Sequence, residues 1–437
     1  MLLFNAETIC KAAEYSMLFQ PSGEVLPCHY NRGYILGKYP DNSIREIWHG
    51  KKREELIKSI KRNFYHHGCF QCKTDSENGL THSVGKNKYL YVKTNNKNFP
   101  SLMEFQLDNI CNLECIMCSG EYSSKIRQNI EKGDKYISPY DDRFVEQLEP
   151  FIPFLEQAVF TGGEPFLFPI YYKIWDLIGK IKPELQIFVS TNGTVLNDKV
   201  KHYLNKLNFN FTISIDSINE ETYCKIRRNA KLDDTLNNID FFIKYSNDRN
   251  ASLNIKCLVL PQNYTDIPDM IEYFNKQQIN VLPKLAHLPL YTSMSSLAND
   301  DLNKVIKVLS STGFTPDSAT TVHNRNRLNE IIRQIELITM RNTFDGNTFV
   351  DLTVEDLKQM LEFHILAGLK NFDKSAIRDF SYYQNIVNIL YVSINQEFQL
   401  KKALINFLKL SPEFIINEFH RNNTEKLIAR FRQLNIS

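Results

Sequence analysis

The sequence predicts an α/β protein whose central part is a parallel sheet with helices outside it. Short apolar segments of strand character recur between residues 102 and 286, and segments of helical periodicity separate them. This alternation is typical of parallel sheets, because each crossover helix covers a face of the sheet. In addition, glycines and polar residues follow several of the expected strands directly. Ligand sites of parallel α/β folds collect at the carboxyl ends of strands, so we expect the functional site there.

The expected elements follow one another in the order of the chain. In Leu102–Asp108, apolar and polar residues alternate around Phe105 and Leu107, as in a half-buried strand. Further strands are expected over residues 158–160, 186–193 with its turn, 211–217, 253–260 and 281–286. Helices are expected over residues 170–181, 200–207, 236–245 and 267–278, and one more is expected to begin near Asn219.

Three cysteines with the spacing C-x3-C-x2-C follow the first of these strands: Cys111, Cys115 and Cys118. Three thiolates can hold three irons of a cubane cluster and leave the fourth iron open, whereas clusters that only carry electrons normally have four cysteine ligands. A partial zinc site and a set of buried thiols are the alternatives. No histidine lies within ten residues of the three cysteines, so the pattern favours the cluster.

A second motif, Thr161-Gly162-Gly163-Glu164-Pro165, ends the next expected strand. Glycine lets a ligand approach the backbone closely, and the free backbone groups together with Glu164 could hold an ammonium group. A plain Gly-Gly turn is the alternative interpretation.

Polar residues end the following two strands. Thr191 and Asn192 follow the strand that begins at residue 186, and Ser214 and Asp216 share one face of the next strand because side chains alternate with period two. Arg227 follows on the helix that begins near Asn219. Each of these residues could instead be a cap or turn residue, since Ser, Thr, Asn and Asp favour such places.

Together, the cysteine run and the Gly-Gly-Glu-Pro run resemble the signature of the radical SAM superfamily. The resemblance implies a partial (β/α)6 barrel, a 4Fe–4S cluster on the three cysteines, and S-adenosylmethionine (SAM) bound to the open iron. One electron then splits SAM into methionine and a 5′-deoxyadenosyl radical, and the electron donor would be a flavodoxin or ferredoxin. The resemblance also implies the SAM contacts, which are the amino group on Gly162, Gly163 and Glu164, the carboxylate on Ser214 and Arg227, and the ribose and methionine near Thr191, Asn192 and Asp216.

Four more cysteines precede the expected barrel: Cys10, Cys28, Cys69 and Cys72. Four cysteines are a normal structural zinc site, so composition alone leaves the metal open. A glycine turn before Cys28, a Leu-Gly step, the helix Ser43–Trp48 and the final C-x2-C pair resemble the SPASM/twitch domain. This resemblance implies an auxiliary 4Fe–4S cluster, although the domain follows the barrel in most relatives and precedes it here.

Length and composition limit the classes of function. A chain of 437 residues predicts two or three domains, which we place at residues 1–95, 96–296 and 297–437. The net charge of +2 gives no electrostatic reason to expect nucleic-acid binding. No run of 18 apolar residues exists, so we expect no membrane span. Nine cysteines at mostly metal-like spacings, without a signal peptide, predict a cytoplasmic protein.

The resulting hypothesis is a radical SAM enzyme that abstracts a hydrogen atom from its substrate. SPASM/twitch relatives often crosslink, epimerise or oxidise ribosomal peptides, so a peptide or protein substrate is expected first and a small metabolite second. A non-catalytic interaction protein with zinc at both cysteine sets is the alternative from another class. Cys224 and Cys257 are interpreted as packing residues, and the helical periodicity after residue 297 predicts a helical region without indicating its role.

Overall fold

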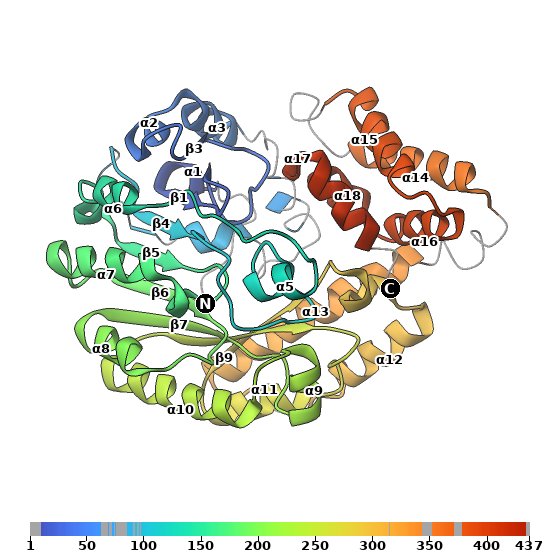
Figure 1. Ribbon diagram of the computed structural model, residues 1–437. Coiled ribbons are helices and arrows are strands. Elements are labelled where there is room, and N and C mark those ends of the chain that lie inside the picture. Colours follow the sequence, from blue (N-terminus) through green and yellow to red (C-terminus); the bar gives the residue numbers. More distant parts are fainter. Residues whose placement is uncertain are drawn as a thin grey trace.

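The computed structural model describes residues 10–62, 69, 72–73, 75, 85–90, 92–93, 96, 98–313, 315–342, 352–370 and 378–433. Its centre is a nine-stranded sheet with the strand order β3-β2-β1-β4-β5-β6-β7-β8-β9 (Figure 1). The expected strands form six parallel members of this sheet: β4 (Leu102–Phe105), β5 (Gln157–Phe160), β6 (Gln186–Thr191), β7 (Asn208–Ser214), β8 (Leu253–Val259) and β9 (Asn280–Leu285). The α/β class with a parallel sheet is thereby confirmed.

Helices cover the outer face of the six parallel strands. The crossovers contain α6 (Asp142–Leu148), α7 (Pro169–Ile181), α8 (Asp198–Lys206), α9 (Glu220–Ile226), α10 (Leu232–Arg249) and α11 (Ile267–Lys276). Strand residues alternate accordingly: in β8, Ile255 and Cys257 are buried in the core under these helices, whereas Lys256 is only half-buried and faces the inside. The alternation separates a dry outer core from an inner face that carries polar groups.

The N-terminal region continues the same sheet instead of forming a separate unit. Strand β1 (Ser16–Phe19) pairs in parallel with β4, and β2 (Glu24–Leu26) and β3 (Gly37–Lys38) extend the sheet antiparallel beyond it. Helices α1 (Ala12–Tyr15), α2 (Ile44–Trp48) and α3 (Lys51–Lys61) and the 3-10 helix η1 (Gly85–Tyr89) complete this region. The predicted helix at Ser43 begins with a capping box, in which Ser43 and Glu46 each accept the other's backbone N–H.

The region after residue 297 is helical, as predicted, and has two parts. Helices α12 (Asn299–Ser310) and α13 (Ala319–Asn342) pack on the barrel, where Leu302 and Ile335 join its hydrophobic core. A second core holds together α14 (Val354–Leu369), α15 (Phe380–Val392), α16 (Glu397–Leu408), α17 (Pro412–Arg421) and α18 (Thr424–Gln433), which lie beside the barrel (Figure 1). The loop expected over residues 341–347 is only partly visible, because Arg341 and Asn342 end α13 and residues 343–347 lie outside the described residues. The three-domain division stays a prediction.

The described helices include none that combines the length and the apolar character needed to cross a bilayer.

The continuous sheet makes the N-terminal strand part of the barrel core. The ring of Phe19 stacks on Phe105 of β4 with centroids 5.5 Å apart and meets the edge of Phe144 of α6 at 5.0 Å. Phe19→Ala should therefore lower the free energy of unfolding by about 3–5 kcal/mol, the range for large-to-small changes of aromatic core residues. Denaturant unfolding followed by far-UV circular dichroism measures this.

The matched control is Lys38→Ala, an exposed position of β3 that should change the stability little. A single unfolding transition is expected for the wild type, since the N-terminal strands and the barrel share one sheet. Similar midpoints for Phe19→Ala and Lys38→Ala would contradict the shared core.

Candidate active site

A loop between β4 and α5 (Ser124–Asn129) carries Cys111, Cys115 and Cys118. The loop is fixed by backbone hydrogen bonds to the residues that end α9, because Ile116 donates to the carbonyl of Ile226 at 3.0 Å and Glu114 to that of Arg228 at 3.1 Å. All three thiols keep partial exposure. They therefore lie at the carboxyl end of the parallel strands, where the sequence predicted the site.

The three thiols lie close enough to one another to influence each other's ionisation. Burial raises the pKa of Cys111 to about 12, and Glu164 and Cys115 contribute further. Burial also raises the pKa of Cys118, again with contributions from Cys115 and Cys111. Metal ligation requires thiolates, so this group of thiols needs a strongly cationic partner to ionise together. An iron–sulfur cluster supplies that charge, so the donor set fits one.

The Gly-Gly turn after β5 packs directly on the cysteine loop. Gly162 has a φ of +121°, which L side chains rarely adopt. A Cβ on Gly163 would lie 2.1 Å from the carbonyl oxygen of Ile110, and the N–H of Glu164 donates to that oxygen at 2.8 Å. The turn thus holds the start of the cysteine loop in place.

The carboxylate of Glu164 differs from our expectation. The side chain is fully buried and accepts hydrogen bonds from the hydroxyl of Thr191 at 2.8 Å and from the N–H of Asn192 at 2.8 Å. Burial raises the pKa of Glu164 to about 7, against the lowering effect of these hydrogen bonds. Because the carboxylate already has protein partners, an ammonium group at this turn would have to bind the backbone rather than the Glu164 side chain.

Asn192 connects the end of β6 to the cysteine loop. Its side-chain amide donates to the Oδ1 of Asn112 at 3.0 Å and lies 4.0 Å from the sulfur of Cys111. Its own Oδ1 accepts from the N–H of Thr194 at 2.9 Å. The structure thus brings Thr191 and Asn192 to the site, as predicted, and gives Thr191 the role of holding Glu164.

A buried ion pair lies on the other side of the cysteine loop. Arg227 and Asp216 approach to 2.7 Å, and Asp216 is completely buried and also accepts from the N–H of Leu258 at 2.7 Å. The Nε of Arg227 is buried and has no hydrogen-bond partner among the described residues. Burial raises the pKa of Cys115, and the positive charge of Arg227 opposes this rise, which places the guanidinium beside the loop. The site therefore offers one unused donor to an anionic group.

Ser214 and Arg227, the two residues expected to hold the SAM carboxylate, differ in their protein partners. Within the described part of the chain, Arg227 pairs with Asp216, and no hydrogen bond joins it to Ser214, which ends β7 half-buried. Asp216 is completely buried, and its two oxygens face Arg227 and the backbone of β8. Asp216 is a positioning residue for Arg227.

The second cysteine set surrounds one small cavity. Cys10, Cys28, Cys69 and Cys72 line it together with Tyr30, Asn31 and Tyr89. In the described ranges, no group of three or more His, Cys, Asp or Glu side chains is arranged to hold a single metal ion. A tetrahedral zinc would need four sulfurs about 2.3 Å from one point. The arrangement of the four thiols around a cavity therefore fits a larger inorganic cluster better than a zinc ion.

Sequence reasoning missed Asn31, which contacts two sulfurs of this second set. Its N–H donates to the sulfur of Cys28 at 3.2 Å, and its side-chain amide donates to the sulfur of Cys69 at 3.1 Å. Hydrogen bonds to cluster sulfurs tune reduction potentials, so Asn31 has a role in the same site. An Asn three residues after a cysteine is too common to have indicated this.

The C-terminal helices also reach the site, which the sequence did not indicate. Glu121, three residues after Cys118, pairs with Lys426 of α18 at 2.7 Å and with Arg430 at 3.6 Å. From the N-terminal region, Arg32 donates to the hydroxyl of the adjacent Tyr122. All three parts of the chain therefore meet at the segment that follows the three cysteines.

Comparison with known proteins identifies two regions. Residues 106–274 match the radical SAM superfamily, and residues 10–73 match an iron–sulfur cluster-binding domain, SPASM. A molybdenum cofactor biosynthesis protein 1 from Dictyostelium discoideum is 25% identical over 51% of this chain and 35% of its own length. A probable GTP 3′,8-cyclase from Methanocaldococcus jannaschii is 26% identical over 47% of this chain and 68% of its own length.

Among solved structures, native anSMEcpe with bound AdoMet is similar over 48% of this chain and 58% of that chain, at 19% identity and a TM-score of 0.38. Streptococcus suis SuiB bound to the precursor peptide SuiA is similar over 68% of each chain, at 12% identity and a TM-score of 0.36. The chain spans only about a third of the Dictyostelium relative and less than two thirds of anSMEcpe.

The contact between Gly163 and Ile110 makes a specific prediction about iron content. Gly163→Val would displace the carbonyl of Ile110 and with it the start of the cysteine loop. After anaerobic reconstitution we expect the iron content to fall from about eight per chain towards about four, the content of one cubane. SAM cleavage should fall in parallel.

Gly313→Val is the matched control, because a Cβ at Gly313 meets no atom within 4 Å. A Gly163→Val protein that retains as much iron as the Gly313→Val protein would show that the turn does not hold the cysteine loop.

Proposed function

Because this chain belongs to the radical SAM superfamily and carries an iron–sulfur cluster-binding domain, we propose that it cleaves SAM reductively to abstract a hydrogen atom from a substrate. The cofactors of these two regions are SAM and 4Fe–4S clusters, and the family is one of enzymes, so the non-catalytic alternative is set aside. A cluster with an open iron supplies one electron to SAM, which yields methionine and the 5′-deoxyadenosyl radical. The observation that supports the proposal best is the set of three thiols beside the unused donor of Arg227.

The residues have the following proposed roles. Cys111, Cys115 and Cys118 hold the cluster that binds SAM. Arg227, positioned by Asp216, donates through Nε to the SAM carboxylate, and the backbone of Gly162 and Gly163 receives the amino group. Glu164, Thr191 and Asn192 fix the turn against the end of β6, and Ser214 faces the bound SAM from the end of β7. The second cluster is held by Cys10, Cys28, Cys69 and Cys72.

The three cysteines of the loop make the first functional prediction. Replacing Cys111, Cys115 and Cys118 together by Ala should abolish 5′-deoxyadenosine formation from SAM under dithionite, while about four irons remain in the second site. Liquid chromatography measures the product. The control is Cys224→Ala, a cysteine that belongs to neither set and hydrogen-bonds Glu220 and the carbonyl of Ala230. Product formation by the triple variant at the control's rate would refute the proposal.

The four cysteines of the N-terminal region give the second functional prediction. Cys69→Ala with Cys72→Ala should remove one cluster and lower the thermal stability, because a metal cluster couples to folding and closes long loops of the chain. The loss should extend beyond the N-terminal region, since β1 is part of the barrel sheet. Uncoupled SAM cleavage should persist at least in part. Iron analysis and calorimetry measure the two effects, and an unchanged melting temperature with half the iron would contradict the coupling.

For the substrate, we propose first a peptide or protein, which the SPASM/twitch-like module supports. Modification would be a crosslink, an epimerisation or an oxidation, with a flavodoxin or ferredoxin as electron donor in the cytoplasm. Incubation of the reconstituted enzyme with candidate precursor peptides from neighbouring genes, followed by mass spectrometry, tests this. A loss of two hydrogens or an exchange of deuterium into the peptide would support it, and unmodified peptides would count against it.

A small metabolite is the second candidate, and specific observations favour it. The sequence relatives include GTP 3′,8-cyclases, which by name act on a nucleotide. In this chain, two lysines, Lys256 and Lys284, face the inside of the barrel, where a long apolar peptide would bury their charges without compensation. Metabolite extracts incubated with the enzyme and SAM, and compared with and without dithionite, test this candidate.

A further inference from the structure

The inner face of the barrel carries two lysines on adjacent strands. Lys256 of β8 is opposite Leu282 of β9, and Lys284 of β9 is opposite Leu258 of β8. The two lysines are diagonal neighbours on adjacent strands, about 7–8 Å apart, and their side chains leave the sheet on the same side. The alternate residues of these strands, such as Ile255 and Val281, are buried in the outer core. Both lysines therefore point to the interior.

Among the described residues, the two lysines differ from the neighbouring cations in their partners. No ion pair or hydrogen bond to either side chain is found within the described ranges, although the neighbouring cations have partners: Lys88 pairs with Glu104, Arg227 with Asp216, and Arg327 with Glu330. Burial lowers the pKa of Lys284 to about 7, and Lys256, Arg327 and Lys88 lower it further, while Asp75 opposes this. Burial also lowers the pKa of Lys256.

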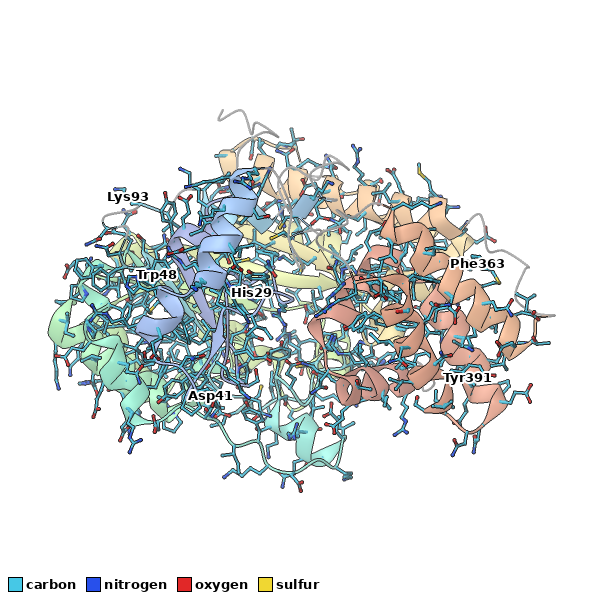
Figure 2. All side chains as sticks on the ribbon, turned by 90° about the horizontal axis from the view of Figure 1, so that it is seen from above. His29, Asp41, Trp48, Lys93, Phe363 and Tyr391 are labelled. Carbon is cyan, nitrogen blue, oxygen red and sulfur yellow. The ribbon has the colours of Figure 1, made fainter. Side chains whose placement is uncertain are left out.

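Buried ammonium groups without a counter-ion are costly for a folded protein. Both lysines nevertheless keep part of their surface accessible although protein surrounds them, so they border an internal space rather than a packed core. His29 lies in the same environment. Burial lowers its pKa, and four nearby cations lower it further: Arg32, Lys88, Lys256 and Lys284. In Figure 2, His29 is labelled beside the N-terminal helices, on their side toward the C-terminal helices.

The two lysines also lie between the two cysteine sites. The Nζ of Lys284 lies 5.5 Å from the centre of the ring of Tyr30, and Tyr30 lines the cavity of the four N-terminal cysteines. On the other side, Lys256 interacts electrostatically with Asp216 and Arg227, which adjoin the loop of the three cysteines. An anionic group held by both lysines would therefore lie between the SAM site and the second cluster.

We propose that Lys256 and Lys284 form an oxyanion-binding site that holds a phosphate or carboxylate group of the substrate inside the barrel. Two ammonium groups without a hydrogen-bonded counter-ion among the described residues match the charge of such a group, and charge-assisted hydrogen bonds are strong in a water-poor interior. The role of this anion as part of the substrate rests on the proposed function, whereas the oxyanion site itself does not. The proposal therefore calls for a substrate that carries an anionic group at this position.

The test uses the reconstituted full-length protein and two probes, inorganic tripolyphosphate and citrate, in titration calorimetry at constant ionic strength. Lys256→Gln and Lys284→Gln should each weaken binding of the better probe by about tenfold or more, the effect of losing a charged hydrogen bond. Lys206→Gln, at an exposed position of α8, is the control and should bind like the wild type. Stronger binding of tripolyphosphate indicates a phosphate-bearing substrate, and stronger binding of citrate a carboxylate-bearing one.

Folding of the variants is checked independently. Without a probe, the melting temperatures of the lysine variants should equal or exceed that of the wild type, because each removes a buried charge without a partner. With the probe, only the wild type and the Lys206→Gln control should gain thermal stability, since a ligand stabilises the state that binds it. Equal affinity in all four proteins, or no saturable binding of either probe to the wild type, would overturn the proposal.

Two further measurements separate this inference from the proposed function. Saturating SAM should leave the affinity of the probe unchanged, and competition between the two would show that the lysines bind SAM instead of the substrate. Formation of 5′-deoxyadenosine by a wild type that binds neither probe would overturn only the oxyanion site. Lysine-dependent probe binding by a wild type that never cleaves SAM would overturn only the proposed function.

Discussion

The close contact between Gly163 and the carbonyl of Ile110 is the constraint on which the site depends. The three-cysteine loop contains no helix or strand, so its shape comes from what surrounds it. The Gly-Gly turn supports the beginning of the loop, and the residues that end α9 support its middle. Burial raises the pKa values of Cys111 and Cys118, and the neighbouring thiols raise them further. A mobile loop would let these thiols move apart. Only glycine permits the turn to come this close.

Several polar side chains of the site already have protein partners, so few of them are left to bind a ligand. Glu164 and Asp216 look like ligand residues in the sequence, yet both carboxylates are buried and serve other residues. Glu164 ties the turn to the end of β6, and Asp216 orients Arg227 and anchors β8. Buried carboxylates are stable only with such partners. Under the proposed function, SAM would therefore contact the backbone of the turn and one nitrogen of a guanidinium.

The continuous sheet gives the N-terminal cysteines their place. Because β1 pairs with β4, the second cysteine set is attached to the strand that leads into the first set. Tyr30 lies between the N-terminal cavity and Lys284, so the interior of the barrel borders both sites. Lys426 of α18 pairs with Glu121. This ion pair connects the C-terminal helices, whose role is unassigned, to the segment beside Cys118. The N-terminal cysteine set is therefore held beside the barrel by the shared sheet, although it precedes the barrel in the chain.

The sequence by itself predicted the α/β class, the six parallel strands, most of their helices and the resemblance to the radical SAM superfamily, because periodicity and short spacings are local properties of the chain. It also identified both cysteine sets, since ligands on one loop or in one C-x2-C pair are visible without a fold. Only the tertiary structure decided that Asp216 pairs with Arg227, that Asn31 contacts two sulfurs, and that β1 joins the barrel. Lys256 and Lys284 were also invisible in the sequence, where they are ordinary lysines in two apolar strands. Their significance arises from the face of the strand on which they lie and from the absence of a counter-ion among the described residues, and both depend on residues far away in the chain.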